Sequence, residues 1–195
     1  VFSSSATIYG LSNKKFIKED SLIKPINPYG NTKATIEQIL CDLYNSIDKE
    51  WKIINLRYFN PIGAHESGLI GENPLDIPEN IIPLLNKVAA GQIREFQVFG
   101  NDWDTIDGTG VRDYIHVMDL AFAHLKAFEY IFNGCKNNIN IKVNIGTGKG
   151  TSIIELINTY KEVNNVDIPY VFVERREGDV PYSVADNTMA KSLLN

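Results

Sequence analysis

Hydrophobic and polar residues form runs along this chain that predict strands and helices. Residues 1–9 read as a buried strand whose carboxyl end carries small polar side chains. Residues 28–49 predict a long helix that begins at Pro28, because the apolar side chains Ile36, Ile39, Leu40, Leu43, Tyr44 and Ile47 recur at helical spacing. Residues 52–58 predict a second buried strand. A strand, a helix and a strand in this order form a βαβ unit, which implies a parallel sheet.

Shorter elements separated by polar, glycine-containing segments follow. We predict loops over residues 59–78 and 101–110, helices over 79–91, 118–133 and 152–163, strands over 95–100, 113–117, 141–145 and 170–174, and a helical segment over 187–195. Gly91 would end the first of these helices, and Thr151 or Ser152 would cap the third. The alternation of strands and helices indicates the α/β class.

Composition and charge narrow the classes of function. The chain has 195 residues, of which 44% are hydrophobic, and its net charge is −5 from 19 basic and 24 acidic residues. An acidic chain without a basic run argues against a nucleic-acid partner. Cys41 and Cys135 provide no disulfide framework and suit a reducing compartment. Because the sequence shows neither an apolar stretch of about 18 residues nor a signal peptide, we expect a cytoplasmic protein without a membrane partner.

The strongest chemical signal is a tyrosine and a lysine four residues apart, Tyr29 and Lys33, downstream of the serine-rich strand that contains Ser5. Residues i and i+4 share a helix face, and a lysine cation beside a phenol favours the ionised phenol. Such a phenol can shuttle a proton near neutral pH, while Ser5 holds the oxygen that loses the proton. This set suits oxidation of an alcohol beside a nicotinamide, although the bare pair also fits a solvated helix face.

Other signals point more weakly to chemistry. The segment from Gly146 to Gly150 follows a strand and precedes a helix, but it matches neither glycine-rich phosphate motif, so we expect a tight turn. His65, His116 and His124 lack metal-ligand spacing, so no metal site is expected, and no G-x-S-x-G elbow surrounds Ser5. Arg175 and Arg176 could clamp a diphosphate or form a surface charge cluster, and Arg112 is a second candidate for a phosphate contact.

Taken together, the motifs resemble those of the UDP-glucose 4-epimerases, which are extended short-chain dehydrogenases/reductases. The matching segments are FSSSATIYG at residues 2–10, PYGNTK at 28–33, LRYFNPIGAH at 56–65, IPENIIP at 77–83, FGND at 99–102, DGTGVRDYIHVMDLA at 107–121, NIGTGKG at 144–150 and RREGD at 175–179. They cover nearly the whole chain in order, so the resemblance is more specific than any single motif.

The resemblance implies a partial Rossmann-type parallel sheet with helices and a smaller mixed α/β substrate domain. Residues 1–60 would form the C-terminal half of the NAD-binding domain, and residues 61–195 mainly the sugar-nucleotide domain, with segments near 111–125 and 141–165 returning to the first. It implies NAD as cofactor, UDP-glucose and UDP-galactose as substrates, and a homodimer for the full-length protein. It also implies that the chain lacks the glycine-rich NAD-binding part and the extreme C-terminus, and is inactive alone.

The resemblance also assigns roles to individual residues. Tyr29 would be the base that removes the proton of the sugar 4-hydroxyl, with Ser5 assisting and Lys33 tuning Tyr29. Cofactor-binding positions are Ser3, Ser5, Tyr29, Lys33, Tyr58 and Phe59. Substrate-binding positions are Ser5, Asn60, Asn80, Ile81, Gln97, Val98, Phe99, Arg112, Arg176, Asp179 and Ser183. Ser183 matches a position that gates the substituent on sugar C2, so a small residue there leaves room for an N-acetyl group.

Two other functions remain open. A sugar-nucleotide 4,6-dehydratase uses the same tyrosine, lysine and NAD, but needs an Asp-Glu pair where this chain has Ala6 and Thr7. A non-catalytic sugar-nucleotide-binding fragment is the other alternative, and the presence of Ser5, Tyr29 and Lys33 argues against a degenerate parent protein.

Overall fold

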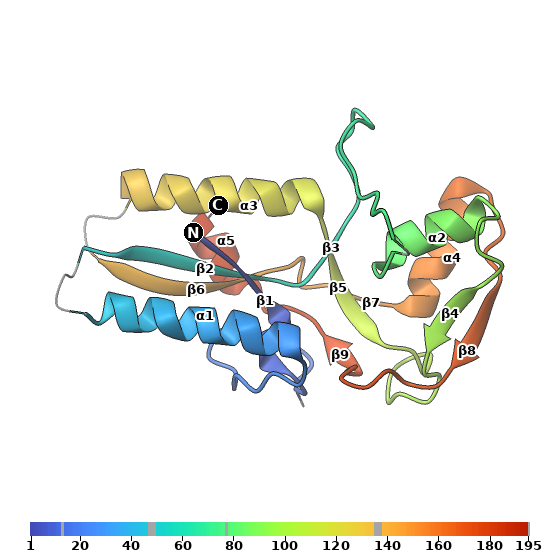
Figure 1. Ribbon diagram of the computed structural model, residues 1–195, viewed down its shortest axis with the longest axis horizontal. Coiled ribbons are helices and arrows are strands. Elements are labelled where there is room, and N and C mark those ends of the chain that lie inside the picture. The colour runs from blue at the N-terminus through green and yellow to red at the C-terminus, as the bar shows by residue number, and fades with distance from the viewer. Residues whose placement is uncertain (13, 47–49, 77, 135–137, 195) are drawn as a thin grey trace.

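The computed structural model describes residues 1–12, 14–46, 50–76, 78–134 and 138–194. A three-stranded parallel sheet in the order β1-β2-β6 forms one end of the molecule, from β1 (Phe2–Ser5), β2 (Lys52–Tyr58) and β6 (Ile139–Ile145). Helix α1 (Pro28–Tyr44) covers one face, and α3 (Val117–Glu129) with α5 (Thr188–Leu194) covers the other (Figure 1). The α/β class with a parallel sheet is therefore confirmed.

The core of this end lies between the sheet and α3. Ile54, Leu56 and Val143 from the strands pack against Leu120 and Ala127 of α3, and all five are buried. Strands buried on both faces usually read as hydrophobic runs, which is why residues 52–58 could be recognised from sequence.

The opposite end of the molecule contains a second, smaller core. Strand β4 (Phe96–Phe99) pairs in parallel with β8 (Tyr170–Val173), and helices α2 (Ile81–Ala89) and α4 (Ile153–Asn164) pack nearby (Figure 1). Leu85, Val98, Ile157 and Ile168 are buried here. Helix α4 differs from the expectation that residues 141–165 return to the first domain: β6 does, but α4 packs in the second core because its buried Ile157 faces Leu85 and Ile168.

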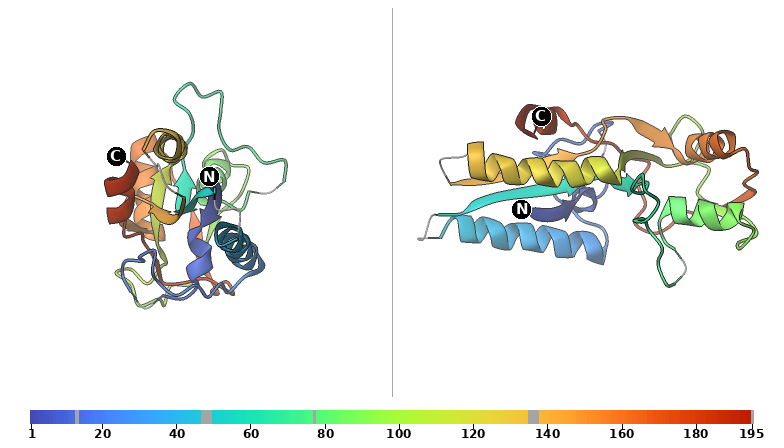
Figure 2. Two further views of the ribbon diagram at one scale, coloured as in Figure 1. Left: turned by 90° about the vertical axis from the view of Figure 1, so that its left-hand side faces the viewer. Right: turned by 90° about the horizontal axis from the view of Figure 1, so that it is seen from above.

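Short strands join the two ends. Strand β5 (Val111–His116) pairs in parallel with β3 (Asn60–Ile62) and β9 (Tyr182–Ser183), and antiparallel with β7 (Gly150–Ser152). The right-hand view of Figure 2 shows these segments between the sheet and the second core. Residues 63–76, which follow β3, project away from the body of the molecule (Figure 1). Strand β5 thus connects β3, β7 and β9.

Several element boundaries differ from the sequence-based predictions. The first strand ends at Ser5, because the Ser5 side chain caps a 3₁₀ turn over Ala6–Tyr9. The predicted loop 59–78 contains β3, and β7 and β9 were not predicted, since strands of two or three residues carry no periodic signal. Helix α1 begins at Pro28 as predicted but ends at Tyr44, and residues 47–49 lie outside the described residues. Ser152 caps α4 through a capping box, as one of the two predicted alternatives.

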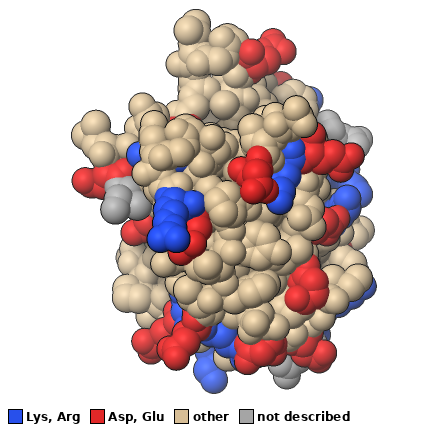
Figure 3. Space-filling model, turned by 90° about the vertical axis from the view of Figure 1, so that its right-hand side faces the viewer, with Lys and Arg blue, Asp and Glu red and all other residues tan. Residues whose placement is uncertain are grey.

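The surface agrees with a chain that carries mixed charge. The end of the molecule with α2, α4, β4 and β8 shows acidic and basic side chains interspersed among uncharged ones (Figure 3). A polyanion would need a continuous basic field, which this face does not show. Across the described ranges, no helix has the length and apolarity needed to cross a membrane.

Candidate active site

The beginning of α1 presents Tyr29. Asn27 caps the helix, since its side chain accepts a hydrogen bond from the Gly30 amide at 2.7 Å, and Pro28 occupies the first turn. A Cβ atom on Gly30 would lie 2.8 Å from the Thr7 carbonyl oxygen, which is closer than real Cβ contacts. Glycine at this position therefore lets α1 approach the 3₁₀ turn that follows Ser5.

Lys33 joins α1 to β1. Its ammonium donates to the Ser3 carbonyl oxygen at 2.9 Å and lies 5.4 Å from the centroid of the Tyr29 ring. An ammonium carries three N–H donors, so it can hold Ser3 and ligand hydroxyls at once. The structure thus brings Tyr29 and Lys33 together as the i, i+4 spacing predicts, and half of the Tyr29 surface is exposed.

Ser5 lines a cavity of about 210 Å³ between β1 and the segment after β8. Its hydroxyl oxygen accepts a hydrogen bond from the Thr7 hydroxyl at 2.9 Å, which directs its own proton elsewhere. The predicted site residues that line this cavity with Ser5 are Tyr58, Phe59, Asn60, Arg112, Asp179 and Ser183. Tyr29 lies outside this set of lining residues.

Tyr58 lies in register with Ser5 on the neighbouring strand and close to Tyr29. Burial raises the pKa of Tyr58, and the nearby Tyr29 phenol adds to this effect, whereas a hydrogen bond with Ser3 lowers it. The Ser3 hydroxyl also lies 2.9 Å from His124 Nε2, and His124 Nδ1 lies 2.9 Å from the Leu120 carbonyl oxygen. Both ring nitrogens of His124 thus have partners, and Tyr58 stays a neutral hydrogen-bond donor at neutral pH.

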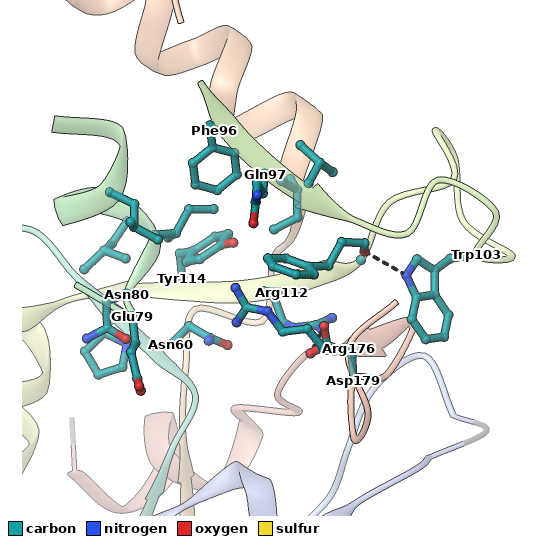
Figure 4. Close-up of a pocket in the computed structure, with 18 residues that line it drawn as sticks. Asn60, Glu79, Asn80, Phe96, Gln97, Trp103, Arg112, Tyr114, Arg176 and Asp179 are labelled. Carbon is teal, nitrogen blue, oxygen red and sulfur yellow. Dashed lines mark hydrogen bonds and ion pairs between the residues drawn. The ribbon is translucent and has the colours of Figure 1, made fainter. Parts of the chain in front are cut away.

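A second cavity, of about 220 Å³, lies between the two cores and shares residues with the first. Figure 4 shows side chains from β4, β5, α2 and the segment after β8 converging on it. The predicted substrate-binding residues that line it are Asn60, Asn80, Ile81, Gln97, Val98, Phe99, Arg112, Arg176 and Asp179. Asn60, Arg112 and Asp179 line both cavities, so the two form one elongated site.

Two arginines give this site its positive charge. Arg112 donates to the Val180 carbonyl oxygen at 2.7 Å and lies 3.4 Å from an Asp179 carboxylate oxygen. The guanidinium of Arg176 lies 3.7 Å from the centroid of the Phe99 ring. Both guanidiniums line the second cavity and could meet a diphosphate with paired N–H donors.

Arg175 does not line either cavity, so the structure brings Arg176 but not Arg175 to the candidate diphosphate position. Its guanidinium donates to Asp102 at 2.7 Å and stacks 3.9 Å from the centroid of the Trp103 ring. Adjacent residues of an extended segment face opposite sides, so one of two consecutive arginines can reach the cavity.

The glycine turn after β6 binds the protein's own carboxylate. The Thr147 and Gly148 amides donate to Asp113 at 2.8 and 2.9 Å, and the Ala185 amide donates to it at 3.1 Å. Asp113 is fully buried, and a Cβ atom on Gly146 would lie 2.6 Å from its Oδ2. The expected tight turn is therefore present, and the Thr147 and Gly148 amides of this turn are occupied by Asp113.

Sequence reasoning missed three aromatic side chains of the second cavity, Phe96, Tyr114 and Trp103. Tyr114 follows Arg112 at the i+2 position of β5, and burial raises its pKa to about 12, so it remains a neutral donor. Alternation along a strand could have placed it beside Arg112. Trp103 comes from a loop and donates to the Phe99 carbonyl oxygen at 3.4 Å (Figure 4). No local pattern indicates Trp103.

Known proteins resemble this chain over its whole length. A family model described as GDP-mannose 4,6 dehydratase matches residues 1–195. The UDP-glucose 4-epimerase of Bacillus subtilis (strain 168) is 49% identical over 194 residues, covering 100% of this chain and 56% of that protein. The UDP-glucose 4-epimerase of Dictyostelium discoideum is 49% identical over 193 residues, covering 97% of this chain and 54% of that protein.

Solved structures of UDP-glucose 4-epimerases have the same fold as this chain. The UDP-glucose 4-epimerase of Stenotrophomonas maltophila, bound to NAD and formylated UDP-arabinopyranose, superposes with a TM-score of 0.94 at 45% identity, covering 99% of this chain and 56% of that one. The Bifidobacterium longum enzyme, bound to NAD⁺ and UDP, gives 0.92 at 46% identity with the same coverage. The chain thus spans about half the length of the relatives and structures it matches.

Proposed function

The chain belongs to the family described as GDP-mannose 4,6 dehydratase, and within this family we propose that it is the catalytic and sugar-nucleotide-binding part of an NAD-dependent UDP-glucose 4-epimerase. This enzyme would interconvert UDP-glucose and UDP-galactose, as part of galactose metabolism. The observation that carries the proposal is the elongated site, in which the serine cavity and the arginine-containing cavity share Asn60, Arg112 and Asp179. A nucleoside diphosphate sugar has this shape, with the anion in the middle.

The residues near Tyr29 fit the nicotinamide half of NAD. Lys33 retains donor capacity beyond Ser3 for ribose hydroxyls, and Tyr58 and Phe59 supply ring surface beside Ser5. Bound NAD would supply the acceptor for a hydride and return the hydride later in the same cycle. The glycine turn of residues 146–150 does not fit the pyrophosphate, because its amides bind Asp113.

The remaining chemistry belongs to this chain's side chains. Tyr29, with Lys33 beside it, would accept the proton of the sugar 4-hydroxyl, and Ser5 would donate a hydrogen bond to the same oxygen as the 4-keto sugar forms. Arg112 and Arg176 would hold the diphosphate while the sugar ring turns between Ser5 and Ser183. The same Tyr29 then returns its proton to the oxygen, giving the opposite configuration at C4.

Dehydration is the alternative reaction that the family's description suggests. It requires an acid and a base to remove water from the sugar, next to the serine. The corresponding side chains here are the buried methyl group of Ala6 and the Thr7 hydroxyl, which donates to Ser5. Neither side chain can serve as a carboxylic acid, so these two residues favour epimerisation.

The proposal also includes a division into domains, a cellular location and an oligomeric state. We assign residues 1–60, with segments of 111–125 and β6, to the cofactor domain, and most of the remainder to the sugar-nucleotide domain. The thiol usage and the sequence pattern favour a cytoplasmic enzyme, and the resemblance favours a homodimer. Sugar-nucleotide binding without catalysis is the second candidate function, which Tyr29 and Lys33 disfavour.

Conversion of UDP-galactose to UDP-glucose in the presence of NAD tests the proposed function. The assay uses the 195-residue chain and a chimaera in which it replaces the matching segment of the Bacillus subtilis relative. We expect conversion by the chimaera and none by the chain alone, because the glycine turn already binds Asp113. If the chimaera binds UDP but does not convert UDP-galactose, the epimerase assignment fails and the binding function replaces it.

Replacing Arg176 with alanine should weaken UDP binding far more than replacing Arg175. A charge-assisted hydrogen bond contributes roughly 1.5–3 kcal/mol, so we expect the Kd of the Arg176→Ala chimaera to rise by about 10- to 100-fold. Arg175→Ala is the matched control, and we expect less than a threefold change because its guanidinium is held by Asp102 and Trp103. Calorimetric titration with UDP measures both, and equal losses would contradict the assignment.

Ser183 should decide whether N-acetylated sugars are accepted. It lies in register with Arg112 on the strand beside β5, and it lines the serine cavity. We expect the chimaera to convert UDP-N-acetylglucosamine, and Ser183→Tyr to lower kcat/KM for this substrate by about 100-fold because the larger ring fills the cavity. Conversion of UDP-galactose by the same variant is the control, and failure of the parent chimaera to convert the N-acetylated sugar contradicts the hypothesis.

A further inference from the structure

A row of buried polar side chains crosses the parallel sheet next to the proposed active site. Ser4, Arg57 and Asn144 are register partners on β1, β2 and β6, and their exposed fractions are 0%, 1% and 0%. The next row along the sheet contains Ser5 and Tyr58. Sheets of this kind usually bury apolar side chains, so a charged row at this place needs an explanation.

Arg57 uses its guanidinium to hold a helix residue. It contacts Glu37 of α1 in a bidentate pair, with Nη2 to Oε2 at 2.6 Å and Nε to Oε1 at 2.9 Å. The Ser4 hydroxyl donates to the same Glu37 carboxylate at 2.5 Å. Arg57 also donates to the Tyr9 hydroxyl at 2.9 Å, and Tyr9 donates to Asn144 at 2.6 Å. Ser4, Tyr9, Glu37, Arg57 and Asn144 are called the Arg57 cluster below.

The cluster lies on the same stripe of α1 as the proposed catalytic side chains. Tyr29, Lys33 and Glu37 follow one another at intervals of four residues, so all three project from one side of the helix. Lys33 contacts the main chain of Ser3, and Glu37 contacts the side chain of Ser4, the residue before Ser5. Consecutive turns of α1 are therefore tied to consecutive residues of β1.

Within the part of the chain that the structure describes, α1 makes few apolar contacts. Gly30 and Glu37 are the buried residues of α1, and Ile39 and Leu43 are 52% and 38% exposed. Ala34 of α1 is partly buried and packs against a small apolar cluster that contains Ala6 and Ile8. A helix with so little core contact could slide or rotate unless directional contacts hold it.

A buried ion pair contributes little net stability compared with apolar residues of the same size, because desolvation offsets the attraction. Its bidentate geometry, by contrast, admits one relative placement of the two elements. We propose that Glu37 and Arg57 are positioning residues, which fix the rotation and height of α1 and thereby set Tyr29 and Lys33 against Ser5. This role rests on the proposed epimerase function, since it concerns the geometry of the same site.

The decisive variant replaces both members of the pair by apolar residues of similar size, Glu37→Leu with Arg57→Met. Such replacements keep or raise stability, so the protein stays folded while the directional contact is lost. We expect kcat of the chimaera to fall by about 100-fold, as for a displacement of about 1 Å, with KM and the Kd for UDP changed by less than about threefold. The diphosphate contacts come from Arg112 and Arg176, which the variant does not touch.

The matched control is the Lys161→Met, Asp167→Leu double variant. This pair has an Nζ to Oδ1 distance of 2.7 Å and lies at the surface near the end of α4, with Asp167 79% exposed at its side chain. We expect kcat within about twofold of the parent. The double variant of Glu37 and Arg57 could instead lose UDP affinity and thermal stability to the same extent as kcat. That result would show a structural role only, and it would overturn the proposal.

A crystal structure of the same double variant separates this proposal from the proposed function. We expect the distance from Lys33 Nζ to the Ser3 carbonyl oxygen, now 2.9 Å, to exceed hydrogen-bonding range in the variant. If this contact persists, Glu37 and Arg57 do not position α1, and the inference is wrong whether or not the parent is an epimerase. If the contact breaks but the parent converts no UDP-sugar, positioning stands and the epimerase assignment falls.

Discussion

Replacing Tyr29 with phenylalanine is expected to lower kcat for UDP-galactose conversion by about 10³-fold in the chimaera, because the variant loses the group that exchanges the 4-hydroxyl proton. The variant keeps the ring, over which the Lys33 ammonium lies. UDP affinity should stay within about twofold, because Tyr29 does not belong to the cavity that contains Arg112 and Arg176. Initial rates and calorimetry with UDP measure the two effects.

Tyr44→Phe is the matched control for this variant. Tyr44 ends the same helix, far from Ser5, so its hydroxyl should be dispensable and kcat should stay within about twofold. If kcat of the Tyr29→Phe variant falls by less than tenfold, a group other than Tyr29 exchanges the 4-hydroxyl proton. The neighbouring phenol of Tyr58 would be the first to examine, since it lies close enough to influence the Tyr29 phenol.

Replacing Arg57 alone with methionine is expected to lower the free energy of unfolding by about 3–5 kcal/mol. The single change leaves the Glu37 carboxylate buried without its cation. Tyr9 cannot replace the lost cation, because a phenol is either neutral or negatively charged, and burial raises the pKa of Tyr9 to about 12. Urea unfolding of the chimaera, followed by circular dichroism, measures the loss.

The partner substitution provides the internal comparison. Adding Glu37→Leu to Arg57→Met should restore most of the lost stability, since the carboxylate is then absent. Lys161→Met is the exposed control, with an expected change below about 1 kcal/mol. If Arg57→Met costs less than about 1 kcal/mol, water reaches the Glu37 carboxylate and the cluster is not the dry network that the buried side chains indicate.

The sequence predicts the local parts of this molecule better than the long-range ones. The spacing of Tyr29 and Lys33, the start of α1 at Pro28 and the cap at Ser152 depend on residues close together in the chain, and the structure shows all three. The run of residues 52–58 was predicted as a buried strand, but nothing in it indicated that Arg57 is buried with a partner. Its partner Glu37 comes from a different element, so only the packed fold reveals the pair.

The site residues also divide into those that local motifs predict and those that only long-range packing reveals. The resemblance identified most of the polar residues that line the two cavities, whereas Trp103 and Tyr114 were missed because a loop and a short strand carry no local signal of what they face. Arg175 was instead included as a candidate although it does not line the cavities. From the sequence, Arg175 and Arg176 look equivalent, but in the structure Asp102 and Trp103 hold Arg175. Short elements such as β7 and β9 exist because of partners distant in the chain.

The register of the parallel sheet also orders the events of folding. Arg57 on β2 is in register with Ser4 of β1 on one side and with Asn144 of β6 on the other. Strand β6 is synthesised much later than β1 and β2, so β2 lacks one neighbour until then. Pairings between such distant segments form slowly, because the intervening chain must first lose its freedom. Before Asn144 is synthesised, Arg57 can contact the Tyr9 hydroxyl, but that hydroxyl lacks its own acceptor on Asn144. The contact between Tyr9 and Asn144 can therefore form only late in synthesis, after β6, the strand that follows α3, has left the ribosome.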